Sequence, residues 1–541
     1  MTDIEIPYEK DRHFKYRFFE ILPGSLSWLM LSMPLVLSLI SVTAAAFFIL
    51  AYILIYFTRS VAVDIRALSG YRAMRKYMKL DWAALVSEVE KQEVSSADIQ
   101  RPKWHLENLI RIGLRQPTIK PSEIVHAIII ATYNESREIV EPTFQAILDS
   151  DYDMKKVILI LAYEERGGER VEAQSKELIE KYKDNFYHAE AVKHPRNIPG
   201  EVIGKGGNDT FAGRRLKEYL ESQNIDPIRV PVTTLDSDNR PDKQYLSALS
   251  YLYSVVPDPV KCSYQPLPMY TNNIWDAPAP MRVIATGNNF FYIVLTQRPH
   301  LERNFSAHAQ SMRSLIDMDF WSVRTVVEDG HQFWRSYFFY DGDYRVYPLS
   351  VPIYQDAVLA NGYIKTIKAQ FVQLRRWTYG ASDVAYIANQ GFFKKNKAPK
   401  FDMITKFLRT LEGHVTWAVG ALLLLLAAFV PVLINPQNYA ANELPLIISR
   451  IQTVGLIGAM ASVYVGMKTL PPRPSRYKRR RSLFMLLQWV YLPVTGIAFG
   501  SFAAIYSQTR LMFGWYVSKF DVTEKAVVSD KPAESSGNSA T

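Results

Sequence analysis

The sequence predicts an α/β domain that stands in the chain between two groups of membrane-spanning helices. The chain has 541 residues, enough for more than one domain, and its mean hydropathy of −0.07 averages over strongly segregated regions. Apolar residues gather in four long runs, whereas short β-branched runs alternate with charged helical stretches between the first and the second of them. Polar residues directly follow each of the short runs, and these residues are the first candidates for a binding site.

The four apolar runs are long enough to cross a bilayer. Runs of roughly 20 apolar residues match the ~30 Å hydrocarbon core of a membrane, which makes these segments membrane candidates and not helices of a soluble core. The first run is too long for a cleaved signal peptide, and no small-residue cleavage site follows it, so we expect it to stay in the protein. The runs extend from Leu26 to Phe57, from Val415 to Ile434, from Leu446 to Val465 and from Leu483 to Tyr506.

Basic residues on both flanks of the first run indicate that both of its ends lie in the cytosol. A helical hairpin fits this better than a single span, with Pro34 or the stretch Ser41 to Thr43 as the place of a kink or turn. Pro493 in the middle of the fourth run favours a second hairpin in the same way. The sequence therefore predicts about six membrane helices, an integral protein of the plasma (inner) membrane, and a cytosolic soluble domain.

The formal net charge of +10 does not indicate a nucleic-acid partner. The clearest basic cluster, RYKRRR from Arg476 to Arg481, lies just outside an apolar run, where the positive-inside rule places it. The single cysteine, Cys262, cannot form an intrachain disulfide, so nothing indicates an oxidising compartment for the soluble part. No spacing of Cys and His residues is typical of zinc, and His308 and His331 are expected to be buried packing residues.

Three short runs of the soluble region, VHAIIIA, KKVILILA and VPVTTLD, are typical of buried strands in a parallel sheet. Each ends in polar residues, and ligands of open α/β sheets bind at the carboxyl ends of the strands. We therefore expect one crevice at which three polar strand ends meet. These ends are Thr132 to Glu135, Tyr163 to Glu165 and Asp236 to Asp238.

The aspartates of the DSD string are candidate metal ligands, because Mg²⁺ and Mn²⁺ bind through one or two carboxylates together with phosphate oxygens of a substrate. Asp236 and Asp238 stand two residues apart at a strand end, which directs both carboxylates towards one spot if the pleat persists. The alternative is an ordinary turn, since DSDNRP consists of turn residues.

Two further strings have a functional and a structural interpretation. In VVEDG, Glu328 and Asp329 offer a carboxylate as a general base, or they form a surface acidic pair at a helix N-terminus. In QLRRW, Gln373, Arg376 and Trp377 share one face of a helix. That face can bind a diphosphate through Arg376 and offers a flat apolar surface for a sugar through Trp377, or it can anchor the helix at the lipid headgroups.

The strings ATYNE, DSD, ED and QxxRW, in this order, resemble those of glycosyltransferase family 2. The chain resembles the membrane-embedded polysaccharide synthases of that family, such as cellulose, chitin and hyaluronan synthases, from Val125 to Lys525. The resemblance implies a GT-A fold for the soluble domain, a nucleotide-sugar donor, expected to be a UDP-sugar, a Mg²⁺ or Mn²⁺ ion, and inversion at the anomeric carbon. FDVTEK, from Phe520 to Lys525, resembles the FxVTxK gating loop of cellulose synthase, which closes over the donor diphosphate.

The resemblance also implies a role for each residue of the motifs. Asp329 would be the catalytic base, with Glu328 beside it to raise its proton affinity or to bind a hydroxyl, and Trp377 would bind the acceptor. At the second strand end the family usually has Asp where this chain has YEER, which leaves open whether Glu164 or Glu165 contacts the nucleobase. The metal ligands would be Asp236 and Asp238, and the donor-binding residues would be Thr132, Asn134, Glu135, Glu164, Glu165, Lys205, Gln373, Arg376, Thr523 and Lys525.

These assignments divide the chain into a series of segments. We expect a cytosolic N-terminus at 1–24, a transmembrane hairpin at 25–58, interfacial and linker helices at 59–122, the GT-A domain at 123–351, interfacial helices with QxxRW at 352–413, two transmembrane helices at 414–468, a basic cytosolic loop at 469–482, a second transmembrane hairpin at 483–508, the gating-loop segment at 509–527 and a disordered tail at 528–541.

The leading functional interpretation is a hexosyltransferase. It would move a sugar, with inversion and with a metal, from a nucleotide-sugar to a growing polysaccharide or lipid-linked acceptor at the cytosolic membrane face, and would translocate the product. A non-processive lipid glycosyltransferase is the near alternative, because the same residues serve both. A membrane transporter or receptor with a degenerate nucleotide-binding domain is the alternative of another class. The expected partners are the donor, the acceptor and the lipid bilayer, with partner proteins for export through an outer layer, if one exists.

Overall fold

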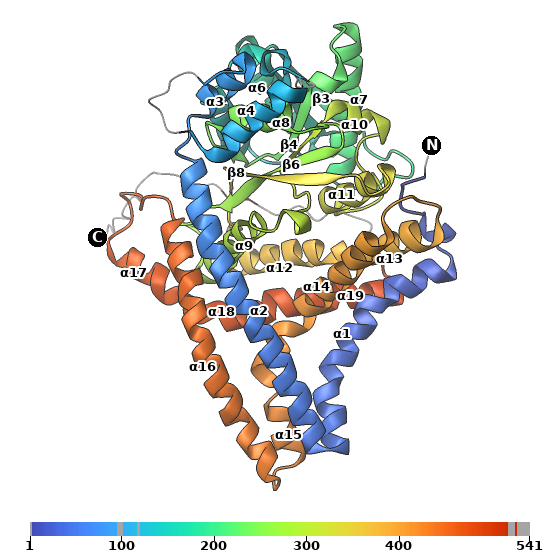
Figure 1. Ribbon diagram of the computed structural model, residues 1–541, viewed down its shortest axis with the longest axis vertical. Helices are drawn as coiled ribbons and strands as arrows, with labels where there is room; N and C mark the ends of the chain where they lie inside the picture. The colour runs from blue at the N-terminus through green and yellow to red at the C-terminus, as the bar shows by residue number, and fades with distance from the viewer. Residues whose placement is uncertain (1–2, 95–100, 116–118, 518–524, 527–541) are drawn as a thin grey trace, which may run out of the picture.

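The computed structural model describes residues 3–94, 101–115, 119–517 and 525–526. Within these residues an α/β domain lies at one end of the molecule and a group of long helices at the other (Figure 1). Between the two parts lie α9 (Ala279–Leu295), α12 (Tyr363–Thr378) and α13 (Asp383–Ala388). The α/β domain thus stands in the chain between two helical groups, as the sequence predicts.

The α/β domain is built on an eight-stranded mixed sheet, within the described residues, in the order β3-β2-β1-β4-β7-β6-β8-β5. The strands β1 (His126–Thr132), β2 (Val157–Glu164), β3 (His188–His194) and β4 (Pro231–Asp236) run parallel. The strand β7 (His308–Ser311) is antiparallel to β4 and to β6 (Cys262–Tyr270). The strand β8 (Arg345–Gln355) is parallel to β6 and antiparallel to the short β5 (Arg240–Pro241). The three predicted strands are β1, β2 and β4.

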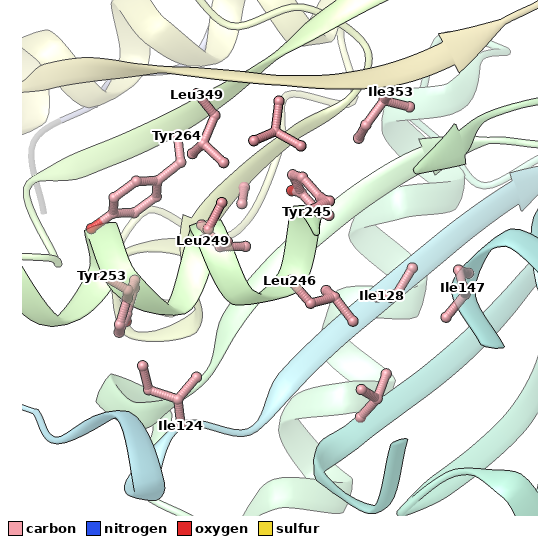
Figure 2. Close-up of a cluster of buried hydrophobic side chains, with 14 of the residues drawn as sticks. Ile124, Ile128, Ile147, Tyr245, Leu246, Leu249, Tyr253, Tyr264, Leu349 and Ile353 are labelled. Carbon is pink, nitrogen blue, oxygen red and sulfur yellow. The ribbon is translucent and has the colours of Figure 1, made fainter. Parts of the chain in front are cut away.

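The parallel strands are buried on both faces, as their continuous apolar sequences predict. On one face Ile128 and Ile130 belong to a core that includes side chains of α8 (Tyr245–Val255), and Figure 2 shows Leu246 of this helix beside Ile128 of β1. On the other face Ala127 and Ile129 pack with α7 (Lys205–Ser222) and α10 (Met312–Asp317). The first layer is completed by α3 (Trp82–Lys91), α4 (Lys103–Arg115), α5 (Arg137–Leu148) and α6 (Gly168–Tyr182).

Four helical segments are long and apolar enough to cross a membrane, among the residues that the structure describes. They are α1 (Phe14–Ile40), α2 (Val42–Tyr77), α16 (Tyr439–Lys468) and the run Arg480–Phe513. The apolar run from Val415 to Ile434 is divided between α14 (Lys400–Leu426) and α15 (Phe429–Ile434). About six membrane helices therefore stays a prediction.

The first two long helices meet at Ser41. Its hydroxyl accepts a hydrogen bond from the N–H of Ala44 at 3.3 Å and caps α2, whereas Pro34 lies inside α1 without ending it. Together the two helices extend beyond the apolar run at both of its ends, because the flanking charged residues continue the helical conformation. Helix α2 therefore extends to Tyr77, into the segment 59–122 that we expected to hold separate interfacial and linker helices.

The last apolar run differs from the expected second hairpin. Here α17 (Arg480–Leu487), α18 (Leu492–Thr495) and α19 (Phe502–Phe513) follow one another through short 3-10 and π-helical turns as one helical run (Figure 1). Pro493 stands where the 3-10 turn Gln488–Tyr491 passes into α18, so the hydrogen-bond pattern of the run already changes at this place. Helix α19 packs against both α1 and α12, and so supports the helix that carries QLRRW.

Candidate active site

A cavity of about 730 Å³ opens at the carboxyl ends of the parallel strands. The strands β1, β2 and β4 end at one level, since Thr132 pairs with Tyr163 and Ala131 pairs with Asp236 in the sheet register. Helix α12 and Lys525 complete the wall. Of the predicted site residues, the wall contains Thr132, Asn134, Glu135, Glu164, Lys205, Asp236, Asp238, Glu328, Asp329, Gln373, Arg376, Trp377 and Lys525.

The two aspartates of the DSD string are each held by a lysine. The Nζ of Lys205 donates to Asp236 Oδ1 at 2.7 Å, and the hydroxyl of Ser306 donates to Asp236 Oδ2 at 2.6 Å. The Nζ of Lys525 donates to Asp238 Oδ1 at 2.8 Å. Burial alone would raise the pKa of Asp236, but the charges of Lys205 and Lys525 hold this pKa well below its ordinary value. Both carboxylates are therefore paired with ammonium groups.

A third carboxylate, Asp356, adjoins this pair and was not predicted. Asp356 directly follows β8, and its backbone N–H donates to Asp238 Oδ2 at 3.0 Å. Its Oδ1 is buried and has no hydrogen-bond partner among the described residues. Burial and the charge of Asp238 raise the pKa of Asp356 to about 7. An unpartnered carboxylate oxygen beside a second carboxylate is a favourable place for a cation.

These residues fit a divalent cation such as Mg²⁺ or Mn²⁺. Carboxylate oxygens are its preferred ligands, and one or two carboxylates suffice where phosphate oxygens of a substrate fill further positions. The described part of the chain has no group of three or more His, Cys, Asp or Glu side chains that would form a complete protein cage. Asp236 and Asp238 would therefore hold such an ion jointly with a bound phosphate, and the unpartnered oxygen of Asp356 agrees with a cation at this place.

Glu328 and Asp329 stand in the first turn of α11 (Glu328–Phe339), and both line the cavity. The Oδ1 of Asp329 accepts a hydrogen bond from the N–H of Gly330 at 2.7 Å. Burial and the charge of Asp329 raise the pKa of Glu328 to about 8, and burial also raises the pKa of Asp329. A carboxyl group whose neutral form is favoured in this way is suited to taking up a proton.

The glycines around Lys205, in GKGGND, are typical of a flexible loop, but Lys205 belongs to the first turn of α7. Gly206 lets this end of α7 approach α11: a Cβ there would lie 2.5 Å from the backbone oxygen of Ser322 and 3.0 Å from the Cβ of Glu328. Burial alone would lower the pKa of Lys205, but the nearby acidic groups, Asp236 first, raise it above its ordinary value. The glycine thus serves close packing, which brings the ammonium group to the carboxylates.

Gln373, Arg376 and Trp377 line the cavity from α12. Burial lowers the pKa of Arg376, although the carboxylates of the cavity favour its charged form. The ring of Trp377 lies 6.1 Å from the ring of Tyr270 at the end of β6, which gives the cavity an aromatic wall. The structure therefore brings a guanidinium group and an aromatic platform together with the carboxylates, whereas the roles of these side chains stay predictions.

The end of β1 is fixed by Glu135. Its Oε2 accepts hydrogen bonds from the hydroxyl of Thr132 at 2.9 Å and from the N–H groups of Tyr133 and Asn134 at 2.8 and 3.2 Å. Burial would raise the pKa of Glu135, but the charge of Lys525 and these hydrogen bonds lower it. Glu135 is therefore charged, and it shapes the strand end that lines the cavity.

At the end of β2, Glu164 is committed to protein partners. Its Oε2 accepts from Arg166 Nη2 at 2.7 Å and lies 3.1 Å from His194 Nδ1. Burial would lower the pKa of His194, but its bonds to Glu164 and Glu201 raise it to about 9. The Arg166 guanidinium lies 5.7 Å from the ring of Tyr133, and both residues line the cavity. Glu164 thus holds the guanidinium group of Arg166 at the cavity wall, where it can contact a ligand.

Two predicted site residues are not found in the cavity wall. The Oε2 of Glu165 accepts a hydrogen bond from the N–H of Arg196 at 2.9 Å, and the side chain does not line the cavity, because the chain turns away after Glu164. Thr523 lies outside the described residues, so that of FDVTEK only Lys525 is described.

Sequence reasoning missed several polar residues of the wall, among them Arg166, Ser306 and Asp356. Ser306 lies in the polar stretch FSAHAQ and could have been flagged there, whereas no spacing marks Asp356. His308 is buried, which lowers its pKa to about 4, and its Nδ1 lies 2.8 Å from the backbone oxygen of Phe305. His331 is also buried, as the sequence predicts, and its Nδ1 lies 2.7 Å from Asp383 Oδ1 of α13.

No protein-family model matches the chain, and a search of curated proteins gives no significant match. Among solved structures it is similar to a mannosyltransferase from Pyrobaculum calidifontis in complex with GDP-Man and Mn²⁺, with 14% identity, 85% of this chain and 98% of that chain covered, and a TM-score of 0.38. It is also similar to S. aureus TarS 1–349, with 12% identity, coverage of 73% and 93%, and a TM-score of 0.35. These TM-scores are too low to establish a shared fold, so the cavity residues themselves carry the functional conclusion.

Proposed function

We propose that the chain transfers a sugar from a nucleoside-diphosphate sugar to an acceptor hydroxyl at the cytosolic face of a membrane, with inversion at the anomeric carbon. The glycosyltransferase family 2 synthases that it resembles make a UDP-sugar the proposed donor. The observation that carries the proposal is one cavity that joins the carboxylates of Asp236, Asp238 and Asp329 with the cations of Lys205 and Arg376. A transporter or receptor with a degenerate nucleotide-binding domain would not require this combination of carboxylates and cations in one cavity.

Each group has a chemical task in this reaction. The acceptor oxygen forms a bond to the anomeric carbon while the bond from that carbon to the diphosphate oxygen breaks, and the acceptor proton passes to Asp329. Arg376 and Lys205 stabilise the negative charge that the leaving diphosphate gains. Trp377 holds the acceptor by its flat apolar face. A Mg²⁺ or Mn²⁺ ion, when bound by the DSD aspartates, would neutralise further charge on the diphosphate.

The surroundings of α12 support a synthase that passes its product through the membrane. Helix α12 lines the cavity on one side and packs against α19 on the other, and α19 belongs to a helical run long enough to cross a membrane. A product that grows at Trp377 is therefore made next to a candidate membrane segment. A single transfer to a lipid would use the same residues, and the size of the product separates the two.

The purified full chain, in lipid nanodiscs, tests the proposal with a panel of nucleotide-sugars and with Mg²⁺, Mn²⁺ or a chelator. We expect release of nucleoside diphosphate from one donor, only with metal, and a ladder of products. Asp329→Asn should abolish transfer while the nucleotide still binds. The matched control Asp343→Asn, in an exposed residue that pairs with Lys261, should retain the wild-type rate. Transfer by Asp329→Asn would remove this residue from its role, and no release from any donor would refute the proposed function.

A further inference from the structure

The loop that leads to the candidate base has an irregular backbone. It connects α10 with α11 and ends at Glu328, and two of its residues, Asp319 and Phe320, adopt left-handed φ angles of 54° and 61°. Non-glycine residues in this conformation persist only where the surroundings hold them. We call residues 318–327 the base loop, because the first two residues of α11, Glu328 and Asp329, follow it directly. Whatever fixes this loop also fixes the place of the carboxylate.

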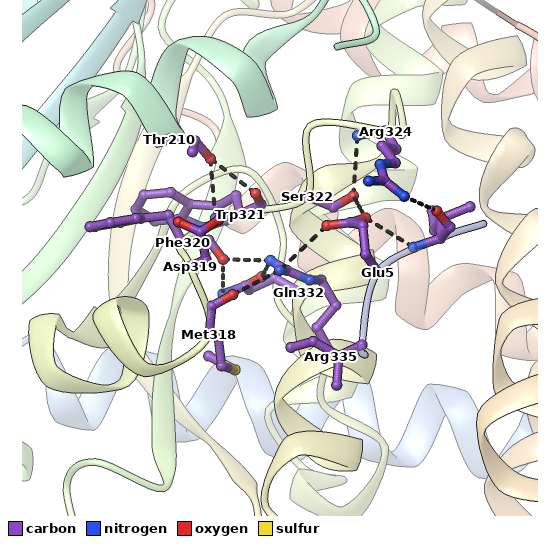
Figure 3. A network of polar contacts seen from close by, with 12 residues as sticks. Glu5, Thr210, Met318, Asp319, Phe320, Trp321, Ser322, Arg324, Gln332 and Arg335 are labelled. Carbon is purple, nitrogen blue, oxygen red and sulfur yellow. Dashed lines mark hydrogen bonds and ion pairs between the residues drawn. The ribbon is translucent and has the colours of Figure 1, made fainter. Parts of the chain in front are cut away.

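The first described residues of the chain bind the base loop from outside. The hydroxyl of Ser322 donates to Glu5 Oε1 at 2.5 Å, and the Nη1 of Arg324 donates to the backbone oxygen of Ile6 at 2.9 Å (Figure 3). The guanidinium of Arg324 also lies 3.7 Å from the centre of the Tyr8 ring. Residues 5–8, the N-terminal strap, thus contact the loop through a charge, a backbone carbonyl and an aromatic ring.

Glu5 reaches both sides of the candidate base. Its Oε2 lies 3.5 Å from Nη2 of Arg335, which is buried in α11 beyond Asp329 (Figure 3). Arg335 in turn donates to the backbone oxygens of Phe320 at 2.5 Å and Met318 at 2.9 Å. One carboxylate therefore links the loop before the base with the helix after it, and it is the only acidic partner of this buried guanidinium among the described residues.

The base loop also contacts α7, the helix that begins with Lys205. The backbone oxygen of Ser322 faces Gly206 in the first turn of α7, directly after Lys205. The base loop is therefore held between the N-terminal strap and the helix that carries the donor-side lysine. A shift of the strap would move Asp329 relative to Lys205 and Asp236, while the strand ends that form the donor side would stay in place.

We propose that Glu5 is a positioning residue for sugar transfer: it fixes the base loop and α11 so that Asp329 meets the acceptor hydroxyl. The inference rests on the proposed function. The strap precedes α1, the first candidate membrane helix, so the position of the base is tied to the helical part of the molecule. Displacement of a reacting group by about 1 Å can cost about a hundredfold in rate, which gives a contact far from the chemistry its effect.

Glu5→Ala removes the contacts of the carboxylate with Ser322 and Arg335, and also its local hydrogen bond from the N–H of Ile6, and is the main test. We expect kcat to fall about ten- to a hundredfold, with the KM for the donor and the affinity for the nucleotide unchanged. Asp3→Asn is the matched control, since Asp3 is an exposed acidic residue of the same stretch whose side chain pairs with Lys394 and not with the loop. Its Oδ1 also accepts a hydrogen bond from the N–H of Glu5 at 3.3 Å, which the amide oxygen of an asparagine can accept as well. It should keep the wild-type kcat. Wild-type kcat in Glu5→Ala would overturn the inference.

Hydrogen exchange gives a second readout that does not depend on activity. Residues 318–330 should exchange faster in Glu5→Ala than in Asp3→Asn, while β1, β2 and β4 stay protected. Ser322→Ala should lower kcat as well. The free-energy effect of the double variant Glu5→Ala/Ser322→Ala on kcat should be smaller than the sum of the two single effects, because both substitutions remove the same contact between Ser322 and Glu5. Additive effects on kcat, or faster exchange over the whole domain, would show that Glu5 contributes to the general stability of the domain and does not position the base loop. If the wild type uses no donor, the proposed function fails, and exchange still decides whether Glu5 holds the loop.

Discussion

Replacement of Lys525 by alanine should strengthen the binding of Mn²⁺ in the absence of nucleotide. The ammonium group of Lys525 lies 2.8 Å from Asp238 Oδ1, and Glu135 and Asp236 are further acidic neighbours. A divalent cation that uses Asp238 must first displace this ammonium group. A hydrogen bond to a charged group contributes about 1.5–3 kcal/mol, and about 1.4 kcal/mol corresponds to a tenfold change in Kd. The variant should therefore bind Mn²⁺ about 10- to 100-fold more tightly.

Calorimetric titration of the full chain with Mn²⁺ measures this change, with Lys365→Ala as the control. Lys365 also lines the cavity, but it forms no ion pair within the described residues, so its loss should leave the Mn²⁺ affinity as it is. The affinity for the nucleotide should change in the opposite direction, because Lys525→Ala removes a cation that the diphosphate would contact. A Mn²⁺ affinity of Lys525→Ala that equals or falls below that of Lys365→Ala would refute the competition between ammonium group and metal.

The rate of transfer should fall with decreasing pH, because Asp329 accepts a proton only when ionised. Since burial raises its pKa, the acid limb of the kcat/KM profile should lie above the ordinary aspartate value of 3.8. Trp377→Ala should raise the KM for the acceptor about tenfold, because it removes an aromatic contact worth about 1.5 kcal/mol. Hydrolysis of the donor by water should continue. Acceptor titrations of the wild type and of Trp377→Ala measure this change. Ile129→Ala should destabilise the domain by about 2–5 kcal/mol and lower its Tm, because this side chain is 0% exposed. Ile110→Ala, in a residue that is 66% exposed, should leave the Tm unchanged.

The parallel half of the sheet could be predicted from the sequence, whereas the mixed half could not. The strands β1, β2 and β4 are continuous apolar runs with polar ends, a pattern that indicates both strand and orientation. The strands β6 and β8 each contain two prolines, Pro266 and Pro268 in one and Pro348 and Pro352 in the other. Proline lacks the N–H that a sheet requires, so such a sequence argues against a strand. The structure accommodates them with a register shift between Pro266 and Leu267.

The residues of the candidate site also fall into a group that the sequence predicts and a group that it does not. Asp238 and Arg376 could be found because each stands in a short string whose spacing has a chemical meaning. Ser306 and Asp356 reach the same cavity from segments that no spacing connects with the DSD string, and only the folded chain brings them there. The helical part was predicted from apolar length, but length alone does not distinguish a hairpin from the continuous run Arg480–Phe513, in which Pro493 stands at a change from 3-10 to α-helical turns and does not end the run.

The pairing of two lysines with two aspartates has a consequence for how a donor binds. Lys205 pairs with Asp236 and Lys525 with Asp238, and a buried charge that loses its partner is costly, so neither lysine can leave until another charge replaces it. A divalent cation alone would separate both ammonium groups from their paired carboxylates, and a diphosphate alone would separate both carboxylates from their paired ammonium groups. On the proposed function the two ligands arrive together, so that the cation takes the carboxylates and the phosphates take the lysines. Metal and nucleotide should therefore bind cooperatively, because each supplies the partner that the other displaces.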